Sequence, residues 1–373
     1  ATLLHLGPGL ANGIANLHNA RRANSPMINI IGNHPNYHIG FDAPLTSDID
    51  TLARNFSCWI KSCSTNETLA QDGADAYTAS LRQSAGSTGQ IATLIMGADA
   101  AWGESTGPVM PNALPQRSKV DEQAIERIAP LLEKGGNNML LLEHHATDPA
   151  ALAAASKLAS KTGCRLMTGT FPGRVDGGPG SIAVERLPYF PEQILKTLAG
   201  VDNLIIVGGQ IPASFFAYQG VPGQLIPKGC KVSRLSHIEE DSIDALQRLA
   251  ERLGAQSEAV TNFEKVEIGK PNGELDTKSI IQSVAATMPD DVIVATDSGG
   301  GNAAYPYCQN SAPNTWLSLF DIGNPEISWV DMAKSFGVPG ATADTAEELC
   351  SLLEKSYETP GPFLIQANGE LQR

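Results

Sequence analysis

The first thirty-five residues constrain the fold more than any other stretch of this chain. An apolar segment ends at His5, and a Gly-Pro-Gly sequence follows at residues 7–9. An amphipathic stretch then continues to about Ala23, before a second apolar segment at residues 27–31. This order predicts a strand, a tight glycine turn, a helix and a second, parallel strand. Ligands bind outside the carboxyl ends of such strands, so we expect His5 at the mouth of a site.

The rest of the chain repeats this alternation of short apolar strands and longer amphipathic helices, which indicates α/β domains with doubly wound parallel sheets. The expected strands are residues 90–96, 139–142, 165–168, 203–207, 231–235, 292–296 and 363–367. The expected helices are residues 67–85, 121–134, 148–161, 191–199, 239–253, 277–288, 328–336 and 345–357. Proline-rich residues 103–117 and polar residues 255–272 interrupt the pattern, so we interpret them as linkers between three domains.

Charge and cysteine usage exclude several classes of protein. The net charge of −14 argues against nucleic acid or an anionic membrane as a partner, since both require a basic surface. No apolar run reaches the roughly 18 residues of a membrane-spanning helix. The six cysteines form no Cys-x-x-Cys pair, which favours reduced structural thiols and a cytoplasmic or otherwise reducing compartment.

Several motifs together carry a family likeness. They are Leu4-His-Leu-Gly-Pro-Gly-Leu-Ala-Asn-Gly13, Ser25-Pro-Met-Ile-Asn-Ile-Ile-Gly32, Asp42-Ala-Pro-Leu-Thr-Ser-Asp-Ile49, Arg186-Leu-Pro-Tyr-Phe-Pro-Glu192, Pro222-Gly-Gln224 and Asp321-Ile-Gly-Asn-Pro-Glu-Ile-Ser-Trp329. With these motifs the whole chain resembles the thiamine-diphosphate-dependent enzymes of the acetolactate synthase and benzoylformate decarboxylase group. The resemblance implies a pyrimidine-binding domain at residues 1–105, a central domain at 118–255 and a pyrophosphate-binding domain at 273–373.

The resemblance also implies a site, its cofactors and an assembly. His5 matches the active-site histidine of benzoylformate decarboxylases, with a role in proton relay to the substrate oxygen. The implied cofactors are thiamine diphosphate and Mg²⁺, held between the chains of a homodimer or homotetramer. The positions that match the loops near the aminopyrimidine and the diphosphate are Gly7, Gly9, Asn12, Ser298, Gly299 and Gly300.

Two departures from the family pattern bear on the cofactor site. The glutamate that protonates the aminopyrimidine lies, in the family, upstream of the segment where this chain begins. The Gly-Asp-Gly motif that binds Mg²⁺ belongs near residues 319–320, and no Gly-Asp-Gly occurs in the chain. We therefore expect the first domain to lack its N-terminal part and the last to lack its middle part. Either the sequence omits segments of a longer protein, which we favour, or the chain is a shortened relative that cannot hold the cofactor.

Other polar and aromatic residues have both a functional and a structural interpretation. His5 can instead cap a strand end, and His34 and His38 can be surface histidines rather than part of a substrate pocket. Phe215 and Tyr218 are candidates for the pocket wall from the central domain. Tyr218 stands where benzoylformate decarboxylases carry a second histidine, which puts benzoylformate itself in doubt as substrate.

Three further features could be taken for ligand sites, but the sequence argues against each of them. His144-His145 lacks accompanying metal ligands, and adjacent residues of an extended chain point to opposite sides, so we expect no metal there. Gly208-Gly209 follows a strand in the domain that holds FAD in flavin-containing relatives, but a complete Gly-x-Gly-x-x-Gly is missing, which argues against FAD. Asp297 is interpreted as part of a turn, because a single carboxylate does not bind Mg²⁺.

The resemblance implies an enzyme that decarboxylates a small 2-oxo acid or joins it to a second carbonyl compound, with the cofactor as electron sink. Two alternatives from other classes stay open. One is a non-catalytic relative that acts as a scaffold or binding protein after losing the cofactor. The other is a nucleotide-binding protein with an NAD-type central sheet, which would require a complete glycine fingerprint after a strand.

Overall fold

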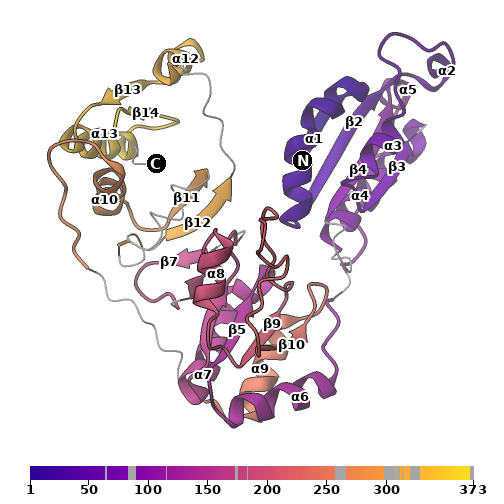
Figure 1. Cartoon of the computed structure of the whole chain (residues 1–373). Coiled ribbons are helices and arrows are strands. Elements are labelled where there is room, and N and C mark those ends of the chain that lie inside the picture. The colour runs from indigo at the N-terminus through magenta and orange to yellow at the C-terminus, as the bar shows by residue number, and fades with distance from the viewer. Residues whose placement is uncertain are drawn as a thin grey trace. The chain divides into compact units, whose positions relative to one another are not determined.

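The computed structural model describes residues 1–63, 65–82, 90–114, 116–172, 175–182, 184–256, 266–297, 308, 311–312, 314–319 and 328–369. The chain forms two compact units. Figure 1 labels the helices and strands that are described below. The first unit is Ala1–Val120 together with His237–Asp241, and the second unit is Asp121–Ser236 together with Ser242–Arg373. The division into three domains stays a prediction.

The first unit is built on a parallel four-stranded sheet of order β1-β2-β4-β3. Its strands are β1 (Thr2–His5), β2 (Met27–Asn33), β3 (Trp59–Cys63) and β4 (Ile91–Gly97). Its helices are α1 (Leu6–Arg22), α2 (Asn36–Ile39), α3 (Ile49–Ala53), α4 (Asn66–Leu81) and α5 (Ala98–Trp102).

Both faces of this sheet are covered, as the side chains of β4 show. Ile91 and Ile95 pack with Leu10 and Leu17 of α1. Leu94, which points to the opposite face, packs in a second cluster with partly buried residues of β3 and α4. Strand β4 is therefore apolar along its whole length, which is typical of a parallel strand buried on two sides.

The second unit contains a parallel five-stranded sheet of order β10-β9-β5-β6-β8. Its strands are β5 (Asn138–Leu142), β6 (Arg165–Thr168), β8 (Glu185–Arg186), β9 (Asn203–Val207) and β10 (Lys231–Ser236). The helices around it are α6 (Glu122–Glu133), η1 (His144–Thr147), α7 (Pro149–Thr162), α8 (Pro191–Thr197) and α9 (Ser242–Arg252).

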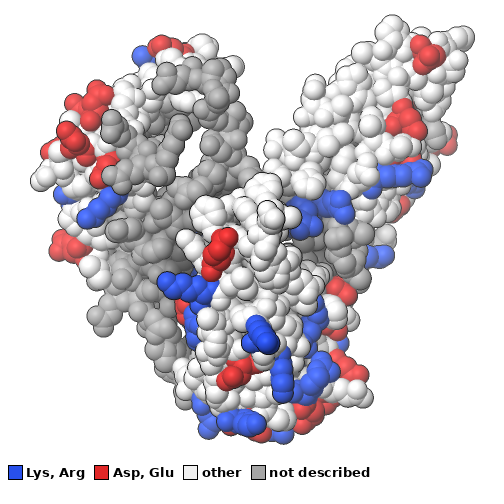
Figure 2. Space-filling view, viewed as in Figure 1, with Lys and Arg blue, Asp and Glu red and all other residues white. Residues whose placement is uncertain are grey.

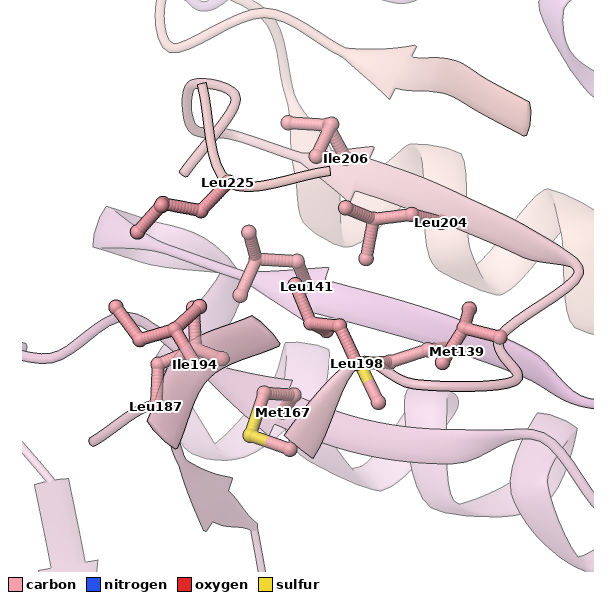
Figure 3. Packing of buried hydrophobic residues seen from close by; sticks show 10 residues of the cluster. Met139, Leu141, Met167, Leu187, Ile194, Leu198, Leu204, Ile206 and Leu225 are labelled. Atoms are coloured by element: carbon pink, nitrogen blue, oxygen red, sulfur yellow. The ribbon is translucent and has the colours of Figure 1, made fainter. Parts of the chain in front are cut away.

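The core of this sheet lies between its central strands and α8. Met139 and Leu141 of β5 pack against Ile194 of α8 and Leu204 of β9, and all four are nearly inaccessible to solvent (Figure 3). Because side chains alternate along a strand, the equally buried Leu140 faces the other side of the sheet. The sheet is thus covered on both faces, as in the first unit.

The other strands of the second unit form two smaller sheets. One has the order β11-β12-β7 and the other pairs β13 with β14. The strands are β7 (Val175–Gly177), β11 (Val292–Asp297), β12 (Asn314–Leu319), β13 (Gly340–Ala343) and β14 (Leu364–Ala367). The helices are α10 (Thr277–Thr287), α12 (Trp329–Ser335) and α13 (Ala346–Glu358).

The predicted α/β class is confirmed, with two corrections. The sheets of four, five and two strands are parallel throughout, but β12 pairs antiparallel with β7, so the three-stranded sheet is mixed. The predicted glycine turn at residues 7–9 is wrong, since these residues form the first turn of α1. Among the described helices, none combines the length and apolar character that a bilayer crossing requires.

Candidate functional site

His5 lies on an abrupt strand-to-helix turn at the carboxyl edge of the first unit's sheet. It is the last residue of β1, its side chain is exposed, and α1 begins at the next residue. Leu6 makes the turn alone, with a φ of 55° in the left-handed region that non-glycine residues seldom adopt. A left-handed leucine costs about 1–2 kcal/mol. The buried Leu6 side chain offsets this cost, and the turn leaves His5 projecting at the mouth of the sheet.

Gly7 is the point of closest approach between α1 and the loop that follows β2. A Cβ atom at this position would lie 2.2 Å from the hydroxyl of Ser47 and 2.3 Å from its Cβ. Gly9 is different, because a Cβ there would meet the nearest atom, Cβ of His5, at an ordinary 3.5 Å. Glycine is therefore required at position 7 by packing, whereas position 9 has room for a methyl group.

His34 and His38 lie together in the loop after β2, which we name the histidine loop (residues 33–48). Their ring centroids are 5.2 Å apart in an edge-to-face arrangement, and Phe41 continues the group at 5.9 Å from His38. The Nε2 atom of His34 is buried and accepts or donates no hydrogen bond among the described residues. A buried imidazole nitrogen of this kind is costly unless a ligand or water satisfies it.

Asp99 holds the histidine loop against the end of β4. Its Oδ2 atom accepts hydrogen bonds from the backbone N and from the side-chain Nδ2 of Asn36, each at 3.0 Å. Its Oδ1 atom is buried and has no partner among the described residues. In the sheet register His5 pairs with Gly32, one residue before the histidine loop. The carboxyl edge of this sheet therefore carries an imidazole, a second imidazole with an unsatisfied nitrogen, and a carboxylate.

The structure places the remaining predicted site residues as follows. Asn12 is exposed on α1. Phe215 and Tyr218 lie in the second unit, on the loop after β9, where Phe215 packs against the rings of Phe171, Tyr189 and Phe216. Ser298, Gly299 and Gly300 lie outside the described residues, directly after the end of β11.

Sequence reasoning missed several residues that contact the candidate site residues or the loop that carries them. Ser47, Asn36 and Asp99 escaped attention because each acts on a residue distant in the sequence. A signal for Asp99 existed, because Gly-Ala-Asp at residues 97–99 directly follows the strongest predicted strand. Polar residues at such strand ends commonly build sites in parallel sheets.

His144 and His145 have structural partners in the second unit. The Nδ1 atom of His144 lies 3.0 Å from the carbonyl oxygen of Gly208. The Nε2 atom of buried His145 accepts a hydrogen bond from the backbone N–H of Ser242 at 2.9 Å. His144 thus joins the loop after β5 to the loop after β9, and His145 joins it to the start of α9. The described residues contain no group of three histidine, cysteine or acidic side chains that could hold a metal ion.

The six cysteines are free thiols, and burial raises the pKa of several of them. The effect is largest at Cys308, where burial raises the pKa to about 12. Burial likewise raises the pKa of Cys164. A protonated, buried thiol is a poor nucleophile, so these cysteines act as small apolar core residues.

Comparisons with known proteins agree with this architecture. Residues 1–53, which hold β1, α1, β2 and the histidine loop, match the family described as thiamine pyrophosphate enzyme, N-terminal TPP binding domain. The chain is 39% identical over 321 residues to IlvX of Mycobacterium tuberculosis, which carries the provisional name of an acetolactate synthase large subunit. This match covers 86% of the chain and 60% of IlvX, so the chain spans less than two thirds of that relative.

Solved structures give the same fold at low sequence identity. A 4-hydroxybenzoylformate decarboxylase of Rhodococcus jostii that depends on thiamine diphosphate matches with a TM-score of 0.78 and 18% identity over 99% of this chain and 87% of its own. A benzoylformate decarboxylase of Polynucleobacter necessarius matches with a TM-score of 0.69 and 13% identity over 98% of this chain and 86% of its own.

The fold is thus that of the thiamine-diphosphate-dependent enzymes. The match of residues 1–53 and the 39% identity to IlvX go further than fold. The chain belongs to the thiamine pyrophosphate enzyme family and is related to acetolactate synthase large subunits.

Proposed function

We propose that this protein is a thiamine-diphosphate-dependent enzyme that decarboxylates a 2-oxo acid or joins it to a second carbonyl compound, as acetolactate synthase does. One observation carries the proposal. An exposed histidine stands on a strained strand-to-helix turn, at the edge of a sheet whose strands β1 and β2 lie in the residues that match the cofactor-binding domain of the family. Strain at such a position is retained where the surrounding structure serves a function.

The residues around His5 fit one side of the proposed cofactor. Gly7 lets Ser47 of the histidine loop pack directly against the start of α1, because a Cβ atom there would collide with it. Together with Gly9 and exposed Asn12, it would border the aminopyrimidine ring. Bound thiamine diphosphate would supply an electron sink for cleavage of the bond next to the carbonyl. Ser298–Gly300 and Mg²⁺ would contact the diphosphate group of the cofactor, within a homodimer or homotetramer.

The chain's own side chains would then orient the substrate and move protons. His5 is exposed and would hold or deliver a proton at the substrate oxygen, a task suited to imidazole near neutral pH. His34 would contact the substrate through its unsatisfied Nε2 atom. Phe215 and Tyr218 of the second unit stay candidates for the wall of a substrate pocket.

Thermal unfolding with and without thiamine diphosphate and Mg²⁺ tests cofactor binding. A ligand that binds only the folded protein stabilises it by about 2.7 kcal/mol at a concentration one hundred times its Kd. We therefore expect the melting temperature to rise at saturating cofactor. An unchanged melting temperature of the full-length protein would contradict the proposal and favour a scaffold that has lost the cofactor.

Release of CO₂ from pyruvate and from benzoylformate tests the role of His5. We expect His5→Ala to keep the cofactor-induced rise in melting temperature and to lose turnover by about 10²–10⁴-fold, the usual effect of removing a general acid or base. His18→Ala, which removes another exposed histidine from α1, is the control and should leave turnover unchanged. Equal activity of the two variants would exclude His5 from catalysis.

A further inference from the structure

The parallel sheet of the second unit has a crevice of the kind that binds ligands in α/β proteins. From β5 the chain moves to β6 and β8 on one side, and then returns to β9 and β10 on the other side. The direction of strand order therefore reverses between β5 and β9. Ligands of such sheets bind at this reversal, outside the carboxyl ends of the two strands. Glu143 follows β5 there, and Gly208, Gly209 and Gln210 follow β9.

The side chain of Glu143 fills this crevice, and glycines surround it. A Cβ atom on Gly209 would lie 1.9 Å from its Oε2 atom, and a Cβ on Gly169, after β6, would lie 2.4 Å from its Oε1 atom. Gly208 has a φ of 69°, and a Cβ there would lie 2.8 Å from the carbonyl oxygen of Glu143. Gly169 and Gly209 thus make room for the carboxylate of Glu143, and Gly208 makes room for its backbone carbonyl group.

Hydrogen bonds hold both the carboxylate and its surroundings. The backbone N–H of Gln210 donates to Oε2 of Glu143 at 3.0 Å. His144 fixes the carbonyl group of Gly208, and Arg234 donates to the carbonyl group of Gly209. The guanidinium of Arg234 also lies 3.4 Å from the side-chain oxygen of Gln210. Hydrogen bonds to Glu143, His144 and Arg234 therefore hold the loop after β9 in place around the carboxylate.

These features are what a phosphate group needs at such a crevice. A glycine pair after a strand lets the ligand approach the backbone, a free N–H donates to its oxygens, and a nearby arginine adds positive charge. Here the carboxylate of Glu143 takes the N–H and fills the space between the glycines. It would also repel an incoming phosphate, since like charges within a few ångströms are strongly unfavourable in a partly buried site.

We propose that the carboxylate of Glu143 occupies this anion site permanently. The second unit therefore binds no nucleotide, FAD included, at the crevice between β5 and β9. Removing the side chain would open a site for a nucleotide diphosphate, with Arg234 and the N–H of Gln210 as its ligands. The proposal does not depend on thiamine diphosphate, and its test contains none.

Thermal unfolding with ADP as the probe tests the proposal. We expect ADP and FAD to leave the melting temperature of the unaltered protein unchanged. Glu143→Ala should melt at a lower temperature without ligand and should gain a rise with ADP. Glu192→Ala removes an exposed carboxylate from α8 of the same unit and should respond to neither ligand. Glu143→Gln, whose amide fills the same space, should not respond to ADP either.

Binding of ADP or FAD to the unaltered protein, measured by equilibrium dialysis, would overturn the proposal. An ADP response of Glu143→Gln as large as that of Glu143→Ala would overturn it too, because the space would then be irrelevant. If Glu143→Ala fails to fold, the second variant is Glu143→Ser, which empties most of the same space and leaves a small polar side chain. A folded Glu143→Ser that ignores ADP would equally contradict an anion site.

Discussion

At the scale of single residues, Gly7 shows how a close contact between α1 and the histidine loop depends on the absence of a side chain. We expect Gly7→Ala to destabilise the first unit by about 1–3 kcal/mol, the usual cost of overpacking, because its new methyl group would overlap Ser47. Gly9→Ala is the matched control in the same helical turn. It should be neutral or stabilising by up to about 1 kcal/mol, since alanine favours helix and has room here.

Urea unfolding of the two variants measures the difference. The double variant Gly7→Ala with Ser47→Gly should recover most of the lost free energy of unfolding, because it removes the overlapping hydroxymethyl group. Equal stability of Gly7→Ala and Gly9→Ala would show that the loop moves aside without cost.

Candidate site residues at strand ends could be named from the sequence, whereas the residues that contact them could not. His5, His34 and the glycines stand at strand ends, and a strand end is visible in the local apolar pattern. The left-handed turn at Leu6 was not predictable, because Gly-Pro-Gly is a stronger local signal for a turn than leucine. Asp99 and Ser47 act across dozens of residues, a relation that one sequence does not reveal.

At the scale of elements, strand β3 was missed for a related reason. In its sequence, Trp59-Ile-Lys-Ser-Cys63, a lysine and a serine interrupt the apolar pattern that would predict a buried strand. The structure supplies the missing partner, since Nζ of Lys61 lies 2.6 Å from Oδ1 of buried Asp72 on α4. Thr68 donates a further hydrogen bond to Asp72 at 3.1 Å. A charged residue in a strand is thus paired from the helix that covers it.

This pairing of β3 with α4 should make stability depend on pH. Burial disfavours the charged form of Asp72, but Lys61, Cys63 and Thr68 together hold the pKa of its carboxyl group below the ordinary value of 3.8. The ion pair with Asp72 raises the pKa of Lys61 above 10.5. The pair therefore stabilises the fold fully between these two values. Its contribution is lost as the pH falls through the lowered pKa of Asp72 or rises through the raised pKa of Lys61.

We expect Asp72→Asn to lower the free energy of unfolding by roughly 2 kcal/mol at pH 7, because it leaves Lys61 without its close partner. This figure is below that for a fully buried pair, since the side chain of Lys61 is 43% exposed. Asp75→Asn is the control. Its carboxylate is 3.8 Å from Lys61 and 31% exposed, so it should cost less than about 1 kcal/mol. A loss as large for Asp75→Asn would refute a specific role of Asp72, and so would an acid transition unaltered in Asp72→Asn.

The ion pairs between α6 and α9 contribute less to stability than the pair of Lys61 and Asp72. Arg252 pairs with Glu126 at 2.9 Å and Glu133 at 3.2 Å, and all three side chains are at least 40% exposed. Acidic and basic side chains lie side by side over this end of the second unit (Figure 2). Exposed pairs contribute little, so buried Leu246 and Leu249 of α9 hold this helix in place.

At the scale of the whole molecule, the alternation of strands and helices could be predicted from the local sequence pattern. The division of the chain into units depends on contacts between distant residues, which such a pattern does not indicate. Strands 139–142, 165–168 and 203–207 were predicted within one residue of β5, β6 and β9. The pairing of β7 with β12 joins residues more than a hundred positions apart, which no local pattern indicates. The segment His237–Asp241 belongs to the first unit although the residues around it belong to the second. Chain connectivity alone therefore does not define the folding units.

Two compact units with separate cores should unfold in two transitions rather than one. Leu10 lies in the core of the first unit and Leu141 in that of the second, and neither is more than 1% exposed. Truncating either to alanine should cost about 2–5 kcal/mol. Because cooperative unfolding is confined to a contiguous core, we expect Leu10→Ala and Leu141→Ala to lower different calorimetric transitions. Leu3→Ala, at a position 72% exposed, is the control and should leave both transitions in place. If both core variants lower one shared transition, the units unfold together, and stability measured anywhere in the chain would then report on the sheet of the first unit.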